Sequence, residues 1–242
     1  MSSLEGVSGS VVRIARCDLH LSTQSWAFAQ THADAIEAHW RAQLKTNPGY
    51  FNGVIHVMTS GAVAGDTFNA SFIATDFKSA LYWRACGYPA ADAFDAFGSA
   101  LIRSAEGHVL LGRQSAGHIN SGLAYLPGGF IDARDVAPDG TIDIAASIAR
   151  ELREETSLTA SELTPLDGFT IVRVGPQVSL IREFRSSLPS DQLRSLIMSR
   201  LATDPDPELA DIVIIRTAAD LPSANVPAYT SHALTAVFDR EL

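Results

Sequence analysis

Residues 150–158 read Arg-Glu-Leu-Arg-Glu-Glu-Thr-Ser-Leu, and this run decides how the chain is interpreted. Glu154 and Glu155 follow Glu151 by three and four positions, so a helix places all three carboxylates on one face. As structure alone this is unfavourable, because like charges at i,i+4 cost about 0.2–0.5 kcal/mol per pair. A hard divalent cation would turn the repulsion into coordination, since Mg²⁺ binds carboxylate oxygens together with substrate phosphates. The run therefore indicates a metal-binding helix.

A Pro-Gly-Gly turn precedes this helix, in the sequence Leu126-Pro127-Gly128-Gly129. Turn and helix together resemble the Nudix box of the Nudix hydrolases. That pattern reads Gly, five residues, Glu, seven residues, then Arg-Glu-aliphatic-x-Glu-Glu-x-Gly-aliphatic. The resemblance implies a metal-dependent diphosphatase, or pyrophosphohydrolase. It also implies an α/β fold, a Nudix-like α-β-α sandwich around a mixed sheet, here with an N-terminal α+β extension.

The chain departs from the pattern in two places. Ser157 stands where the pattern has its second glycine, so the turn there must be made without glycine's conformational freedom. The pattern also places its first glycine fourteen residues before its arginine, but Gly129 and Arg150 are twenty-one apart, so seven residues are inserted. Because residues 138–140 read Pro-Asp-Gly, we expect a surface loop at about residues 136–141.

The insertion leaves the first acidic position of the pattern open. Counted from the glycine it is Asp135, and counted back from the arginine it is Ile142, beside Asp143. Asp143 is also a natural N-cap for a helix from about residue 143 to 156, and we favour that role for it. Asp132 is a further carboxylate near the expected metal site.

The resemblance also assigns roles to the residues of the box. Glu151, Glu154 and Glu155 would hold one or more Mg²⁺ or Mn²⁺ ions, and the carbonyl of Gly129 would add a ligand. Glu154 is expected to be needed for turnover as well. Arg150 would orient the glutamates, although an ordinary helix ion pair, worth only about 0.3–0.5 kcal/mol, would explain the same residue.

Residues outside the box complete the expected site. In several family members the general base lies on a later loop, which makes Glu208 our candidate and Glu183 the alternative. Arg113 could direct a cation at the diphosphate, or it could be an exposed surface arginine. Trp83 and Arg84 could supply a stacking surface and a cation for a nucleotide, although Trp83 fits a packed core equally well.

Composition limits the classes of function. The 242 residues are 46% hydrophobic with a net charge of −9, which argues against nucleic acid bound by a basic surface. No apolar stretch approaches the roughly 20 residues of a membrane helix, and residues 1–10 lack a signal-peptide pattern. Cys17 and Cys86 form no zinc or disulfide pattern, so we expect a cytoplasmic protein. The expected partner is a small-molecule substrate, as the resemblance implies.

The order of expected elements places a boundary near residue 93. We expect an N-terminal extension or small subdomain over residues 1–93 and the Nudix-like hydrolase domain over residues 94–242. Helices are expected at residues 27–44, 79–85, 143–156, 191–202 and 231–240. Strands are expected at residues 11–21, 51–59, 67–75, 99–103, 109–113, 123–126, 169–174, 178–184 and 212–215. Mixed strands and helices of this kind predict a layered α/β domain.

The N-terminal region suggests a substrate class through a second, weaker resemblance. Its presence, together with the expanded box, is similar to the UDP-sugar diphosphatase branch of the Nudix family. A UDP-sugar would be hydrolysed to a nucleoside monophosphate and a sugar phosphate. Packing or homodimerisation would explain the same region. A catalytically silent Nudix-like domain that binds a nucleotide or a protein partner is the alternative function, favoured by Ser157 and the insertion.

Overall fold

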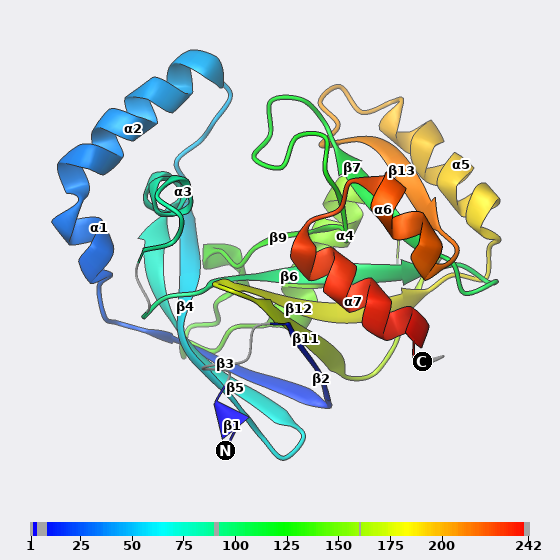
Figure 1. Cartoon of the computed structure of the whole chain (residues 1–242), viewed down its shortest axis with the longest axis horizontal. Coiled ribbons are helices and arrows are strands. Elements are labelled where there is room, and N and C mark those ends of the chain that lie inside the picture. Colours follow the sequence, from blue (N-terminus) through cyan, green and yellow to red (C-terminus); the bar gives the residue numbers. More distant parts are fainter. Residues whose placement is uncertain (1, 4–8, 90–91, 160, 240–242) are drawn as a thin grey trace.

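The computed structural model describes residues 2–3, 9–89, 92–159 and 161–239. Of the stretch on which the signal-peptide expectation rests, residues 1 and 4–8 lie outside the described residues. Two β-sheets lie at an angle to each other, and helices pack against both of them (Figure 1). No helix in the described part of the chain is long and apolar enough to cross a membrane.

The smaller sheet belongs to the N-terminal region. Its strand order is β1-β4-β5-β3, with β4 and β5 antiparallel across the turn at Gly65 and β3 parallel to β5. The strands are β1 (Ser2–Ser3), β3 (Arg16–Ser22), β4 (Val54–Ala64) and β5 (Thr67–Asp76). The helices of this region are α1 (Ala27–Thr31), α2 (Ala33–Thr46) and α3 (Phe77–Ala85). The helix expected over residues 27–44 is thus interrupted at His32, whose backbone leaves the helical conformation.

The larger sheet carries the box. Its main path is β13-β7-β6-β12-β11-β2, with three short strands added at its sides. The main strands are β2 (Ser10–Ile14), β6 (Asp95–Arg103), β7 (Val109–Gln114), β11 (Phe169–Val174), β12 (Gln177–Arg185) and β13 (Leu209–Ile215). The short strands are β8 (Ala124–Tyr125), β9 (Gly128–Phe130) and β10 (Thr164–Pro165). Because β6 and β12 are parallel and their neighbours antiparallel, the sheet is mixed, as expected.

Helices cover both faces of this sheet. The box helix α4 (Ile144–Thr156) and α5 (Ser190–Leu201) bury Ile148 and Ile197 in the core of one face. On the other face α7 (Ala228–Asp239) buries Leu234, and it is preceded by the short turns η2 (Ala218–Asp220) and α6 (Leu221–Ala224). Neighbouring residues of β12 serve opposite cores, Leu180 facing α4 and Ile181 facing α7. This is the expected α-β-α sandwich.

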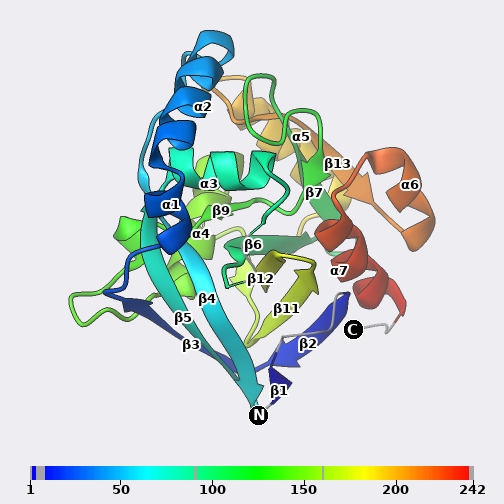
Figure 2. The same cartoon turned by 60° about the vertical axis from the view of Figure 1, so that its left-hand side comes forward.

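Backbone pairing crosses the expected boundary in both directions. β2 comes from the N-terminal region but pairs with β11 at the edge of the larger sheet, beside which it lies in Figure 2. In return, the inserted loop of the box pairs with β3. Leu21 N donates to the carbonyl of Gly140 at 2.8 Å, and Ile142 N donates to the carbonyl of Leu19 at 2.9 Å. The N-terminal region is therefore tied to the remaining chain from both sides.

Candidate active site

The box helix begins and ends where the sequence predicts. Asp143 is its N-cap and accepts a hydrogen bond from Ala146 N at 2.9 Å. Ser157 ends it with a left-handed backbone (φ 56°), the conformation for which the family pattern has glycine. The Ser157 carbonyl accepts a hydrogen bond from Arg200 Nη1 at 2.8 Å, which holds the turn. Neither departure from the pattern displaces the helix.

Asp135 occupies the first acidic position. It lies in a short turn, η1 (Ala133–Asp135), and its buried carboxylate accepts from Arg150 Nη2 at 2.8 Å. Its second oxygen accepts from Ser147 Oγ and from Asp132 N, each at 2.9 Å. Ile142, which has no ionisable group, is buried in the core. The insertion therefore follows the acidic position and leaves its spacing from Gly129 unchanged.

Arg150 links the acidic groups of the box. Besides Asp135, its guanidinium lies 2.6 Å from Glu151 and 3.6 Å from Glu154. Only 15% of its side chain is exposed, so these contacts are much less screened than those of a surface ion pair. Arg134 adds a second cation, 2.6 Å from Asp132, 3.5 Å from Glu154 and 3.9 Å from Glu151. Sequence analysis missed Arg134, although it lies between the two aspartates that were considered.

Burial disfavours the charged form of the Glu151 and Glu155 carboxylates. Burial raises the pKa of Glu151 to about 7, against the opposing charge of Arg150 and with the help of Glu154. Burial, followed by the charges of Glu208 and Glu151, raises the pKa of Glu155 well above its ordinary value. Hydrogen bonds from Gly128 N (3.3 Å) and Tyr125 Oη (3.4 Å) to Glu155 are too long to offset this. Glu151 has the guanidinium of Arg150 at 2.6 Å, whereas no ion pair to Glu155 is present among the described residues.

The Gly-Gly pair explains how the box turn approaches the helix. A Cβ on Gly129 would collide with the carboxylate of Glu151, and a Cβ on Gly128 would collide with the carbonyl of Gly98 on β6. β9 pairs with β6 through the same residues, Gly129 opposite Gly98. Glycine at both positions lets the turn approach β6 and the carboxylate of Glu151 closely.

The residues present fit a hard divalent cation. The donors are oxygens only, which suits Mg²⁺ or Mn²⁺, and the buried glutamates gain most from such a charge. They are not preassembled: in the described part of the chain no three acidic, histidine or cysteine side chains are gathered at metal-binding distance. Glu154 instead lies with Arg134 and Arg150. Glu151 and Glu155 would hold such a cation, which would neutralise their charge.

A cavity of about 670 Å³ opens in front of these glutamates. Glu151, Glu155, Glu208 and Gly129 line one part of it. The N-terminal region lines another part with Tyr50, Phe51, Phe77 and Arg84, beside Phe130 of β9. Arg84 donates to Asn120 Oδ1 at 2.9 Å and so connects the N-terminal region with the loop between β7 and β8. The N-terminal region is thus part of the cavity wall.

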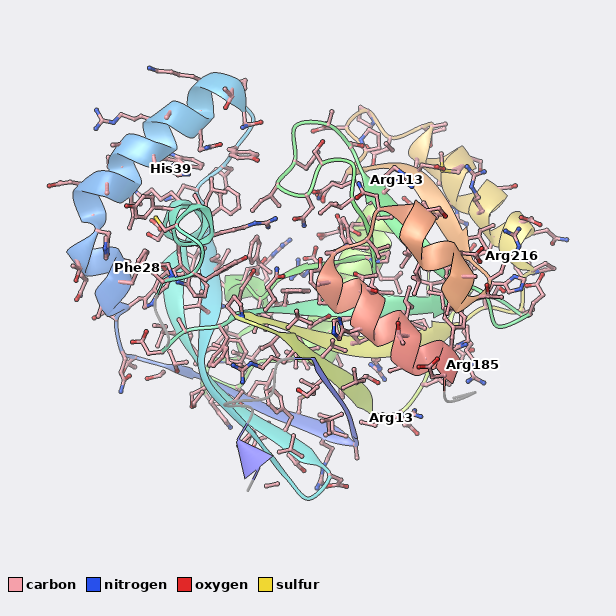
Figure 3. All side chains as sticks on the ribbon, in the orientation of Figure 1. Arg13, Phe28, His39, Arg113, Arg185 and Arg216 are labelled. Atoms are coloured by element: carbon pink, nitrogen blue, oxygen red, sulfur yellow. The ribbon has the colours of Figure 1, made fainter. Side chains whose placement is uncertain are left out.

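Three expectations need correction. Trp83 is 1% exposed and packs edge-on against Trp26 and Tyr88, so it is core and offers no stacking surface. Arg113 does not line the cavity; it donates to the carbonyl of Gly122 and lies at the outer end of β7 (Figure 3). Glu183 pairs with Arg103 at 3.1 Å, outside the cavity, so it is not placed to act as a base.

Residues 94–211 match the family model described as NUDIX domain. This part of the chain is a Nudix domain. The matched residues run from β6 into the first residues of β13. The Nudix domain makes the protein a pyrophosphohydrolase, an enzyme class that cleaves nucleoside diphosphates linked to another group.

Solved structures that resemble this Nudix protein include several hydrolases. A MutT protein from Methanosarcina mazei is 25% identical, covering 61% of this chain and 94% of its own (TM-score 0.40). A C. elegans Ap4A hydrolase is 16% identical, with 58% and 93% covered (TM-score 0.41). A bifunctional NMN adenylyltransferase/ADP ribose pyrophosphatase from Francisella tularensis is 18% identical, with 66% and 45% covered (TM-score 0.42). No curated protein matches the chain.

Proposed function

We propose that this Nudix protein hydrolyses the diphosphate of a nucleotide sugar, with a UDP-sugar as the substrate, to a nucleoside monophosphate and a sugar phosphate. The cavity carries the proposal. It combines the box glutamates with an aromatic wall, and its volume lies within the roughly 300–1,000 Å³ of small-molecule sites. The net charge of −9 supports a small substrate rather than a nucleic acid. We also propose a cytoplasmic location and a homodimer.

Glu151, Glu154 and Glu155, with the carbonyl of Gly129, would hold Mg²⁺ or Mn²⁺. When bound, the cation neutralises the charge of the diphosphate and polarises its phosphoryl oxygens. Arg150 keeps Glu151 in place through its contact of 2.6 Å and is itself held by Asp135. This arrangement supports a positioning role for Arg150, because a single guanidinium bridges two carboxylates of the cluster.

Glu208 is our proposed general base. It lies directly before β13, lines the cavity, and its negative charge contributes to the raised pKa of both Glu155 and Glu151. A base must reach the attacking water within about 2.6–3.2 Å, or through one further water. From the cavity wall Glu208 can take the proton of a water that attacks one phosphorus of the diphosphate. Glu208→Gln is therefore expected to lower kcat by about 10²–10⁴-fold with little change in KM.

The aromatic residues that line the cavity support binding of a nucleobase there. Phe51 is 83% exposed and lies at the cavity wall with Phe77, which in turn contacts Phe130 edge-on at 6.0 Å. Stacking of a base on such a ring contributes about 1–3 kcal/mol. Arg84 supplies a cation to the same cavity. These residues replace Trp83 and Arg113 as the proposed substrate-binding groups.

The alternative, a silent binding domain, has less support. It was favoured by Ser157 and by the insertion. Ser157 adopts the backbone conformation of the glycine that it replaces, and the insertion leaves Asp135, Arg150 and the glutamates together. These observations support the enzyme.

The test is product release from UDP-glucose, ADP-ribose and a dinucleoside polyphosphate at equal concentration, with Mg²⁺ or with EDTA. We expect Mg²⁺-dependent cleavage with the highest kcat/KM for UDP-glucose. Glu155→Gln should abolish it, and Glu37→Gln, which changes an exposed glutamate of α2, should not. A preference for ADP-ribose or the dinucleotide would overturn the UDP-sugar assignment. Absence of metal-dependent cleavage of every substrate would overturn the enzymatic proposal.

A further inference from the structure

A second polar cluster lines the cavity away from the box glutamates. Its centre is the half-buried carboxylate of Asp95, at the first residue of β6. Tyr88 Oη donates to Asp95 Oδ2 at 3.0 Å, and Gln177 Nε2 lies 3.5 Å from the same oxygen. Arg84, on the cavity wall, acts on Asp95 as a nearby positive charge. The proposed mechanism uses neither Asp95 nor Gln177.

The register of the sheet fixes the distance of this cluster from the reacting centre. Gly98 of β6 pairs with Gly129, which touches Glu151. Asp95 lies three residues before Gly98 on the same strand, so the two backbone positions are roughly 10 Å apart at about 3.3 Å per residue. A group joined to a phosphate beside Glu151 therefore reaches Asp95 across one sugar ring.

Asp95 has acceptor capacity left for a ligand. Within the described residues, hydrogen bonds to its carboxylate reach only Oδ2, so Oδ1 is unpaired on a residue that lines the cavity. Burial raises the pKa of Asp95, while the bond from Tyr88 and the charge of Arg84 oppose this. A hydroxyl of a ligand in the cavity can therefore donate to Oδ1.

The chemistry of the cluster selects hydroxyl groups. A carboxylate oxygen accepts from a hydroxyl, as acidic residues do from the ribose hydroxyl in dinucleotide-binding folds. Arg84 and Gln177 donate, and a hydroxyl oxygen accepts in turn. Adjacent hydroxyls on one ring present both functions side by side. Tyr229, which also lines this end, contacts Phe97 edge-on at 4.9 Å and completes a ring-sized wall.

We propose that Asp95, with Arg84 and Gln177, binds the vicinal hydroxyls of the sugar that the diphosphate links to the nucleoside. This contact makes the enzyme specific for diphosphates that carry such a sugar. The inference rests on the proposed nucleotide-sugar hydrolysis and adds the residue that reads the sugar. Tyr88 is a positioning residue, because it touches Asp95 Oδ2 and leaves Oδ1 to the ligand.

The experiment compares kcat/KM of wild type and Asp95→Asn on three substrates with Mg²⁺. UDP-glucose carries uridine and glucose, the phenyl ester of UDP keeps the uridine with its ribose but lacks the glucose hydroxyls, and ADP-glucose keeps the glucose with another base. Asp95→Asn should lower kcat/KM about 10- to 100-fold for both glucose compounds, the effect of one charge-assisted hydrogen bond. The phenyl ester should be hydrolysed as by wild type. Asp18→Asn, at an exposed aspartate of β3, is the matched control.

The outcomes separate the inference from the proposed function. An equal loss on all three substrates would mean that Asp95 supports the fold or binds the ribose that all three share. A loss on both uridine compounds alone would mean that it reads the base. Each of these results overturns the inference. Failure of the wild type to cleave any of the three overturns the proposed function itself. If Asp95→Asn is not folded by thermal melting, Tyr88→Phe takes its place, with the same selectivity for glucose compounds expected at a smaller loss.

Discussion

Replacing Arg150 by alanine is expected to destabilise the metal-free protein by about 3–5 kcal/mol, the cost of removing one partner from a buried ion pair. The side chains of Arg150 and Asp135 are 15% and 2% exposed and 2.8 Å apart. Asp135 would keep its bonds from Ser147 Oγ and Asp132 N but would lose its neutralising charge. Glu151 would lose its contact of 2.6 Å at the same time.

The matched control is a surface pair of the same chemistry. Arg216 and Asp191 are 3.2 Å apart but 50% and 79% exposed, so Arg216→Ala should cost no more than about 0–1 kcal/mol. Urea denaturation in EDTA measures both variants. For a protein of this size about 3 kcal/mol corresponds to a fall in Tm of roughly 6–12 °C.

A second substitution shows whether the loss comes from an uncompensated charge. Asp135→Asn on the Arg150→Ala background should restore part of the lost stability, because the buried negative charge is then absent. If Arg150→Ala costs no more than Arg216→Ala, or if the double variant is less stable than Arg150→Ala, the buried pair does not hold the box together and the reasoning fails.

Three further outcomes are expected. Glu155→Gln should cut Mg²⁺-dependent turnover by orders of magnitude while the metal-free protein melts no lower than wild type; normal turnover would remove Glu155 from the site. For Glu151 the folded pKa of about 7 exceeds the ordinary 4.5, so its contribution to stability is full below pH 4.5 and is lost as the pH rises through 7. At 1.36 kcal/mol per pH unit, the free energy of unfolding should fall by about 3 kcal/mol over this range. Urea titrations at pH 5 and 8 in EDTA measure this fall, and Glu151→Gln should abolish it. An unchanged pH dependence in the variant would contradict the assignment. Ser157→Gly should raise the free energy of unfolding by up to about 1–2 kcal/mol, since glycine tolerates the left-handed backbone, and a destabilised variant would show that the serine side chain matters more.

The sequence predicted what local rules determine. The box helix and its cap at Asp143 follow from the spacing of its side chains, and the family pattern located Glu151 and Glu155. Spacing alone left the first acidic position open between Asp135 and Ile142. The three-dimensional contacts decided it, because Asp135 lies 2.8 Å from Arg150 and Ile142 is buried in the core. The spacing alone did not place Arg134 beside the glutamates.

Contacts between distant segments could not be predicted. Trp83 lies between Tyr82 and Arg84 on a short helix. Which of the three side chains is buried depends on how the helix packs, and the local sequence does not determine that. Asp95 and Gln177 are 82 positions apart and become neighbours only through the parallel pairing of β6 and β12. A strand from the N-terminal region joining the larger sheet was likewise beyond local pattern.

That strand has a consequence for how the chain folds as it is made. Ile14 of β2 pairs with Phe169 of β11, 155 positions later. At about 5–20 residues per second, ribosomes need roughly 8–30 s to produce the partner after β2 has been synthesised. During that interval the edge strand has no mate, and pairings over such separations form slowly. Native folding of the N-terminal segment therefore waits for the second half of the chain, and nascent chains stalled before residue 169 should be protease-sensitive at β2 and prone to associate.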